Sequence, residues 1–138
     1  MARMMKEFHN SSAQSGLIIV VDDDAAVRKS LKFSLEVEGF VVRTYAGGEE
    51  LLNEIVIPNC RCLIIDQKLP GMNGVDLVAR LRDRKIAAPA ILITTHPSPA
   101  LKRRAASAGI PIIEKPLLGS ALLDGICQAI THPTPPAC

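Results

Sequence analysis

The chain has 138 residues, of which 48% are hydrophobic and only 3% aromatic, so it is long enough for one domain with an aliphatic core. Its formal charge of +2 is too small to indicate a nucleic-acid-binding surface. Its apolar runs, such as LIIVV, fall far short of the ~18 residues that would cross a bilayer, and the polar first residues contain no secretory signal.

Five short aliphatic runs are predicted strands, in chain order Leu17–Val21, Phe40–Tyr45, Cys62–Asp66, Ala90–Thr94 and Ile110–Glu114. Helical patterns alternate with them, at Ala25–Glu38, Glu49–Ile55, Gly74–Arg82, between Ser98 and Gly109, and at Gly119–Ile130. The first helix is expected to begin at an Asp24 N-cap and to stop at Gly39. The fourth has Ser98 as N-cap and Pro99 at its first position.

The alternation of strand and helix predicts an α/β fold, a doubly wound parallel sheet with helices on both faces. Residues 17–130 would form this single domain. Residues 1–16 are expected to be a flexible leader, and residues 131–138, with three prolines, a proline-rich tail. The spacing of Cys60 and Cys62, with no nearby histidine, is a poor zinc signal and indicates reduced thiols.

Charged and polar side chains follow the predicted strands. Asp22 and Asp23 end the first, Asp66 ends the third, Thr94 ends the fourth, and Lys115 follows the fifth. Ligands of parallel sheets bind at this carboxyl edge. Taken singly, each residue could be an ordinary strand end in water. Together, the carboxylates suit Mg²⁺, and the hydroxyl and ammonium groups suit a phosphoryl group.

Four motifs in order, VVDDDAAVRKSL, CLIIDQKLPGMNGVDL, ILITTHP and IIEKPL, resemble the receiver domain of two-component response regulators. The resemblance covers Leu17 to Ile130 and is nearest to the receivers of nitrogen-fixation-type regulators. It implies a flavodoxin-like (βα)5 fold with strand order 2-1-3-4-5.

The resemblance also implies roles for individual residues at a Mg²⁺ site. Asp66 would accept a phosphoryl group from a histidine kinase. Asp23 and Asp66 would bind the metal, Asp22 would act on it through water, and the backbone carbonyl of Lys68 would complete the ligands.

Other residues would act on the phosphoryl group itself. Thr94 would donate a hydrogen bond to it and Lys115 would pair with it, with a cis bond between Lys115 and Pro116. Pro70 and Gly74 would shape the loop over the site.

The expected function is that of a stand-alone receiver and not of an enzyme. Its partners would be a histidine kinase or phosphotransfer protein and a downstream protein effector. No direct contact with DNA or membrane is expected, and a homodimer is compatible with this function. The expected location is the cytoplasm. The effector surface would combine the fourth helix, fifth strand and fifth helix, as receivers commonly use.

This chain departs from the receiver pattern at Ile112, where an aromatic residue is usual, and at Thr95, where alanine or glycine is usual. A β-branched isoleucine cannot swing a large flat surface between exposed and buried positions. The signal would therefore travel through the helix after Thr94, whose inner side is predicted to carry Ala100, Ala105 and Ala108.

Two alternatives remain open. Asp22-x-Asp24 after a first strand superficially matches a haloacid-dehalogenase-type phosphatase, although Ala26 and the isolated Asp124 do not match it. The other is a receiver-like binding module that is never phosphorylated, against which the complete acidic set argues.

Overall fold

The computed structural model describes residues 16–117 and 120–131. Within them, five parallel strands form one sheet in the order β2-β1-β3-β4-β5. The strands are β1 (Leu17–Val21), β2 (Val41–Tyr45), β3 (Cys62–Asp66), β4 (Ala90–Thr94) and β5 (Ile112–Glu114). The predicted strand order is therefore confirmed. Most of the predicted leader and tail lies outside the described residues.

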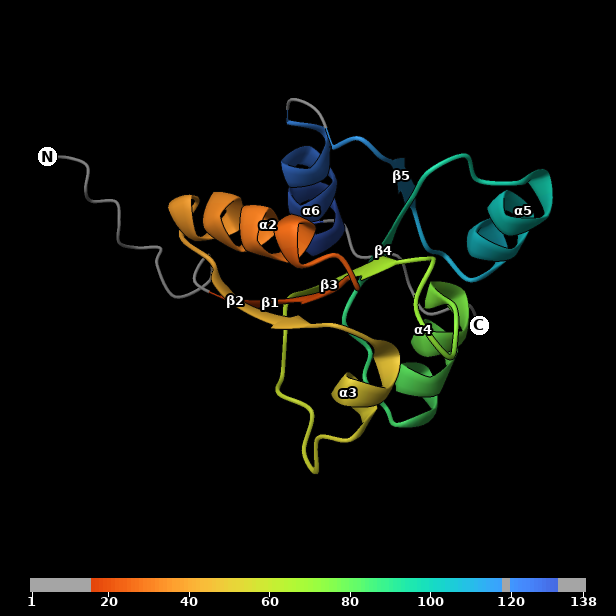
Figure 1. The fold of residues 1–138 in the computed structure, drawn as a ribbon, viewed down its shortest axis with the longest axis horizontal. Coiled ribbons are helices and arrows are strands. Elements are labelled where there is room, and N and C mark those ends of the chain that lie inside the picture. Colours follow the sequence, from red (N-terminus) through yellow and green to blue (C-terminus); the bar gives the residue numbers. More distant parts are fainter. Residues whose placement is uncertain (1–15, 118–119, 132–138) are drawn as a thin grey trace, which may run out of the picture.

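Helices cover both faces of the sheet. They are α2 (Ala25–Val37), α3 (Gly48–Leu52), α4 (Gly74–Asp83), α5 (Pro99–Ser107) and α6 (Ala121–Thr131). Figure 1 shows α2 and α6 on one side of the sheet and α3 and α4 on the other. None of the described helices is long and apolar enough to cross a membrane.

The aliphatic composition of the strands explains this layering. Every residue of β3 and of β4 is buried, as expected for central strands covered on both faces. Alternate residues of β1 enter two separate core clusters, Ile18 with α2 and α6, and Ile19 with α4 and α5. Because all five strands run parallel, their carboxyl ends lie at the same edge of the sheet.

The helix ends are set by local capping. The carboxylate of Asp24 accepts hydrogen bonds from the amides of Ala26 and Val27, and the hydroxyl of Ser98 accepts one from the amide of Leu101. Gly39 and Gly109 follow α2 and α5 with φ of +99° and +72°, a conformation that favours glycine. The capping residues predicted from the sequence are thus confirmed.

Two predicted boundaries are wrong by two residues or more. The helix expected over Glu49–Ile55 ends at Leu52, and the strand expected from Ile110 begins at Ile112. The expected start of the last helix, Gly119, lies outside the described residues. On α5 only Ala105 is buried, so the predicted inner positions of Ala100 and Ala108 are also wrong, because both are exposed.

Candidate functional site

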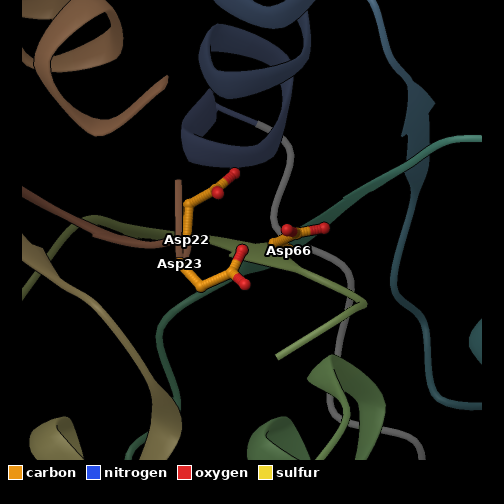
Figure 2. A group of neighbouring side chains, drawn as sticks. All are labelled: Asp22, Asp23 and Asp66. Atoms are coloured by element: carbon orange, nitrogen blue, oxygen red, sulfur yellow. The ribbon is translucent and has the colours of Figure 1, made fainter. Parts of the chain in front are cut away.

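Three aspartates meet at the carboxyl edge of the sheet. Asp22 and Asp23 follow β1 and Asp66 ends β3, and these strands are neighbours (Figure 2). One carboxylate oxygen of each residue lies within 4.8 Å of the others. Asp22 is 0% exposed and Asp66 is 4% exposed, whereas Asp23 faces solvent. The structure therefore brings together the carboxylates that the sequence placed at one edge.

Lys115 lies between two of these acids. Its Nζ is 3.1 Å from Oδ2 of Asp22 and 3.3 Å from Oδ2 of Asp66. The Asp66 contact is a hydrogen bond. The Asp22 contact is an ion pair by distance, but its approach angle is not that of a hydrogen bond, so this buried Oδ2 accepts none. The single ammonium group thus offsets part of the charge of the buried pair.

The crowding of like charges changes the proton affinities of the site. Burial raises the pKa of Asp66, and the nearby Asp22 raises it further, while Lys115 opposes both effects. Burial lowers the pKa of Lys115, but the carboxylates of Asp22 and Asp66 outweigh this and leave its pKa above the usual value. Lys115 is therefore charged at neutral pH. A further positive charge near Asp66 would stabilise its ionised form.

Asp22 is held in place by the backbone amide of the predicted N-cap Asp24 and by Arg28, which the sequence did not single out. The backbone amide of Asp24 donates a 2.9 Å hydrogen bond to Oδ1 of Asp22. The guanidinium of Arg28, in the first turns of α2, donates to the backbone carbonyl of Asp22 at 2.7 Å. In the sequence, the only indication that Arg28 contacts Asp22 is its position four residues after the N-cap Asp24.

The loop after Asp66 is fixed where the backbone of Gly74 packs closely against the backbone of Asp66 and Gln67. A Cβ on Gly74 would lie 2.7 Å from the carbonyl oxygen of Asp66 and 2.7 Å from Cδ1 of Leu92. Gly74 donates its amide to the Gln67 carbonyl, and the Gln67 side chain accepts from the amide of Val75. The requirement for glycine and the role of Gln67 therefore come from the packing of α4 on the end of β3.

Thr94 and Lys68 flank the acidic cluster. Thr94 is 3% exposed at the end of β4, and its hydroxyl donates to the Thr95 carbonyl at 3.4 Å. The amide of Lys68 donates to Oδ1 of Asp66 at 3.3 Å. A cavity of about 670 Å³ lies here, with Asp23, Lys68 and Thr94 among its lining residues.

The peptide bond between Lys115 and Pro116 is cis, as the resemblance implied. Cys60 and Cys62 take no part in the site. Cys60 packs against one core cluster and Cys62 belongs to the other, and both are free. Burial raises the pKa of Cys60 to about 11 and of Cys62 to about 12, so neither is a thiolate at neutral pH.

The acidic cluster has the features of a site for a hard cation. It offers oxygen ligands from three carboxylates, and the buried Oδ2 of Asp22 accepts no hydrogen bond. Magnesium prefers oxygen ligands and retains several waters, which the exposure of Asp23 permits. The donor set therefore fits Mg²⁺.

Residues 18–126 match the family model of the response regulator receiver domain. Over 116 residues the chain is 37% identical to the transcriptional regulatory protein FixJ of Rhizobium meliloti, covering 82% of this chain and 56% of that protein. It is 34% identical to the C4-dicarboxylate transport transcriptional regulatory protein DctR of Rhodobacter capsulatus, over 80% of this chain and 58% of that protein. The chain thus spans little more than half the length of these relatives.

Solved structures agree with this match. A CheY-like receiver domain protein from Methanospirillum hungatei has a TM-score of 0.78 and 30% identity, over 85% of this chain and 94% of that one. The response regulator TrrA of Thermotoga maritima, in complex with Mg²⁺ and BeF, has a TM-score of 0.69 and 27% identity, over 81% and 96%. The fold, the acidic edge and these matches lead to one conclusion: the chain belongs to the response regulator receiver domain family.

Proposed function

We propose that this receiver accepts a phosphoryl group on Asp66, in a Mg²⁺-dependent way, from a histidine kinase or a phosphotransfer protein. The observation that carries the proposal is the position of Lys115 Nζ, within 3.3 Å of carboxylate oxygens of both Asp22 and Asp66. The ammonium stands where it can neutralise charge added to Asp66. Phosphorylation and Mg²⁺ are typical of the receiver family.

Asp23 and Asp66 would hold Mg²⁺ directly, Asp22 would act through water, and the carbonyl of Lys68 would complete the protein ligands. When bound, the metal would neutralise negative charge on the transferring oxygens. The exposed Asp23 supports this assignment because it can reach both the metal and solvent. Asp24 has a different role, since its carboxylate already caps α2.

The transfer itself needs little from the protein beyond position and charge. A carboxylate oxygen of Asp66 attacks phosphorus, an O–P bond forms, and the P–N bond to the donor imidazole breaks. The leaving imidazole keeps the electron pair and takes a proton from water. Lys115 would pair with the transferred group, and the Thr94 hydroxyl, which now donates to Thr95, would turn to donate to it.

The family match favours this function over a haloacid-dehalogenase-type phosphatase, since receiver domains are signalling domains and not enzymes in general. We also propose that this receiver domain acts in the cytoplasm and signals through protein contacts, with homodimerisation as one such contact. The small formal charge of +2 supports the absence of DNA binding by the domain itself.

The deciding experiment is phosphorylation by acetyl phosphate, followed by intact-mass measurement. The wild type should gain one phosphoryl group with Mg²⁺ and none with EDTA, and Asp66→Asn should gain none. Asp24→Asn is the matched control, because it changes an acid two residues from Asp22 that has no place in the metal site. An adduct that persists in Asp66→Asn contradicts the assignment.

An unphosphorylated binding module is the remaining alternative, and Mg²⁺ titration separates it from the proposal. If the chain binds Mg²⁺ with loss of affinity in Asp23→Asn but gains no phosphoryl group from acetyl phosphate or a phosphorylated kinase, the binding module is correct. Equal loss of Mg²⁺ affinity in Asp23→Asn and Asp24→Asn would contradict the proposed ligands.

A further inference from the structure

An apolar groove runs between α2 and the connection that leads into α6, the two helices on one face of the sheet in Figure 1. Its volume is about 560 Å³. Leu31 and Leu35 of α2 and Leu122 of α6 form part of its lining and belong to the core, while Val27 and Leu123 are half-buried. Buried core side chains therefore form part of the wall of this groove.

The apolar surface extends beyond the groove along α2. Phe33 and Val37 are one turn apart and are 70% and 66% exposed. They share a helix face with Ser30 and Ser34, both of which line the groove. An exposed phenylalanine and valine that continue an apolar groove form a patch of the kind that marks an interaction site.

The described chain begins beside this groove. The carbonyl of Gly16 accepts a hydrogen bond from the amide of Val41 at 3.3 Å, and the amide of Phe40 donates to the carbonyl of Leu35. Leu35 and Glu38, at this end of α2, both line the groove. Residues 1–15 are thus attached to the domain next to the end of the groove that lies farthest from Asp66.

The spacing of the apolar residues in that segment suits binding to an apolar groove. Met1, Met4, Met5 and Phe8 have the spacing i, i+3, i+4, i+7 of one helix face, and methionine adapts to irregular apolar surfaces. The six residues NSSAQS that follow His9 and precede Gly16 are polar, and such a linker spans about 13 Å on average. The linker is long enough to let the apolar face turn back onto α2.

We propose that residues 1–8 bind the α2–α6 groove of their own chain as a short amphipathic helix. Met4, Met5 and Phe8 would contact the groove and the exposed Phe33 and Val37. An isolated helix of this length is not stable in water, so the helix and its contact would form together. The proposal goes beyond phosphoryl acceptance, because it concerns a helical face and not the acidic edge.

Hydrogen exchange of the full chain tests the proposal. The leader variant Met4→Ser/Met5→Ser/Phe8→Ser should exchange faster than the wild type at the amides of α2 and of residues 120–123. An attached segment has a millimolar effective concentration, so even an affinity of ~1 mM gives about twofold protection. The matched control is Arg3→Ser/Lys6→Ser/Glu7→Ser, which changes the opposite helix face and should leave these rates unchanged.

A variant on the domain side makes the result independent of the leader. Ser34→Arg places a long charged side chain in the groove from an exposed position, so it should remove the same protection without altering the leader. Equal exchange in all four proteins would overturn the proposal, as would an equal change in α4 on the other face of the sheet. Protection that disappears on tenfold dilution would assign the groove to the leader of a second copy, which also overturns binding within one chain.

Discussion

Helices α4 and α5 pack against the same core cluster, but they bury very different amounts of apolar surface there. Helix α4 buries Val75, Leu77, Val78 and Leu81, whereas α5 buries only Ala105. A large aliphatic side chain contributes about 1.5–3 kcal/mol when it is fully buried. The acidic edge is thus framed by one helix fixed to the core and one that can shift at small cost, and α5 is the element that directly follows Thr94.

Truncation of a core side chain of α4 should have the largest effect. Leu81 is 0% exposed, so Leu81→Ala should lower the free energy of unfolding by about 2–5 kcal/mol through lost burial and a cavity. The same truncation on α5, Leu101→Ala, removes a half-buried side chain and should cost about 1 kcal/mol. Urea unfolding of both variants measures the difference, and equal costs would contradict the contrast between the two helices.

The attachment of α4 to the site can be broken at one glycine. In Gly74→Ser the new Cβ would press on the Asp66 carbonyl and on Leu92, which should cost about 1–3 kcal/mol and weaken Mg²⁺ binding. Gly47→Ser is the control, because a Cβ there meets only Pro70 at 3.7 Å and serine is a good N-cap for α3. Thermal unfolding and Mg²⁺ titration should separate the two variants, and equal Mg²⁺ affinities would show that α4 does not position the loop.

Local opening should differ between the two helices in the wild type. Because α5 has a single buried residue, its amides should exchange about tenfold faster than those of α4, which corresponds to about 1.4 kcal/mol. Hydrogen exchange resolved to peptides from each helix measures this ratio. Exchange at the same rate in both would mean that α5 opens only with the whole domain, and that it is not the mobile element.

The smallest effect concerns the ion pair that links the two helices. Arg104 of α5 contacts Asp76 of α4, and both side chains are about half exposed. Arg104→Ala should cost about 0.2–1 kcal/mol and should raise exchange in α5 alone, with a difference that shrinks in high salt. Arg103→Ala, one position along the same helix, is the matched control. A loss that does not depend on salt would point to lost packing of the arginine stem instead.

The pattern of aliphatic runs was sufficient to predict the sheet. The aliphatic run CLII has no polar face, so it fits a strand covered on both sides, and five predicted strands alternating with helices leave few topologies. The residues at the strand ends followed from the same reasoning, because parallel strands bring their carboxyl ends together. Strand order and the identity of the site needed the resemblance to a known family.

The wrong end of α3 reflects contacts between distant residues. Helix α3 stops at Leu52, and the guanidinium of Arg84, far along the chain, donates to the backbone carbonyls of Leu52 and Glu54. Glu54 itself accepts a hydrogen bond from the hydroxyl of Tyr45. No local pattern reveals such partners. The late start of β5 was accessible from the sequence, since Pro111 has no amide hydrogen to donate to a strand ladder.

The strand order also has a consequence for how the chain acquires its structure during synthesis. Strand β1 emerges first among the described strands, yet it lies between β2 and β3. It can pair with β2 once residues up to Tyr45 are available, but its other edge stays open until Cys62–Asp66 arrive. A nascent chain of intermediate length therefore exposes an aliphatic strand edge, the kind of surface that associates with other chains. We expect the period between completion of β2 and arrival of β3 to be the stage at which this receiver depends most on chaperones.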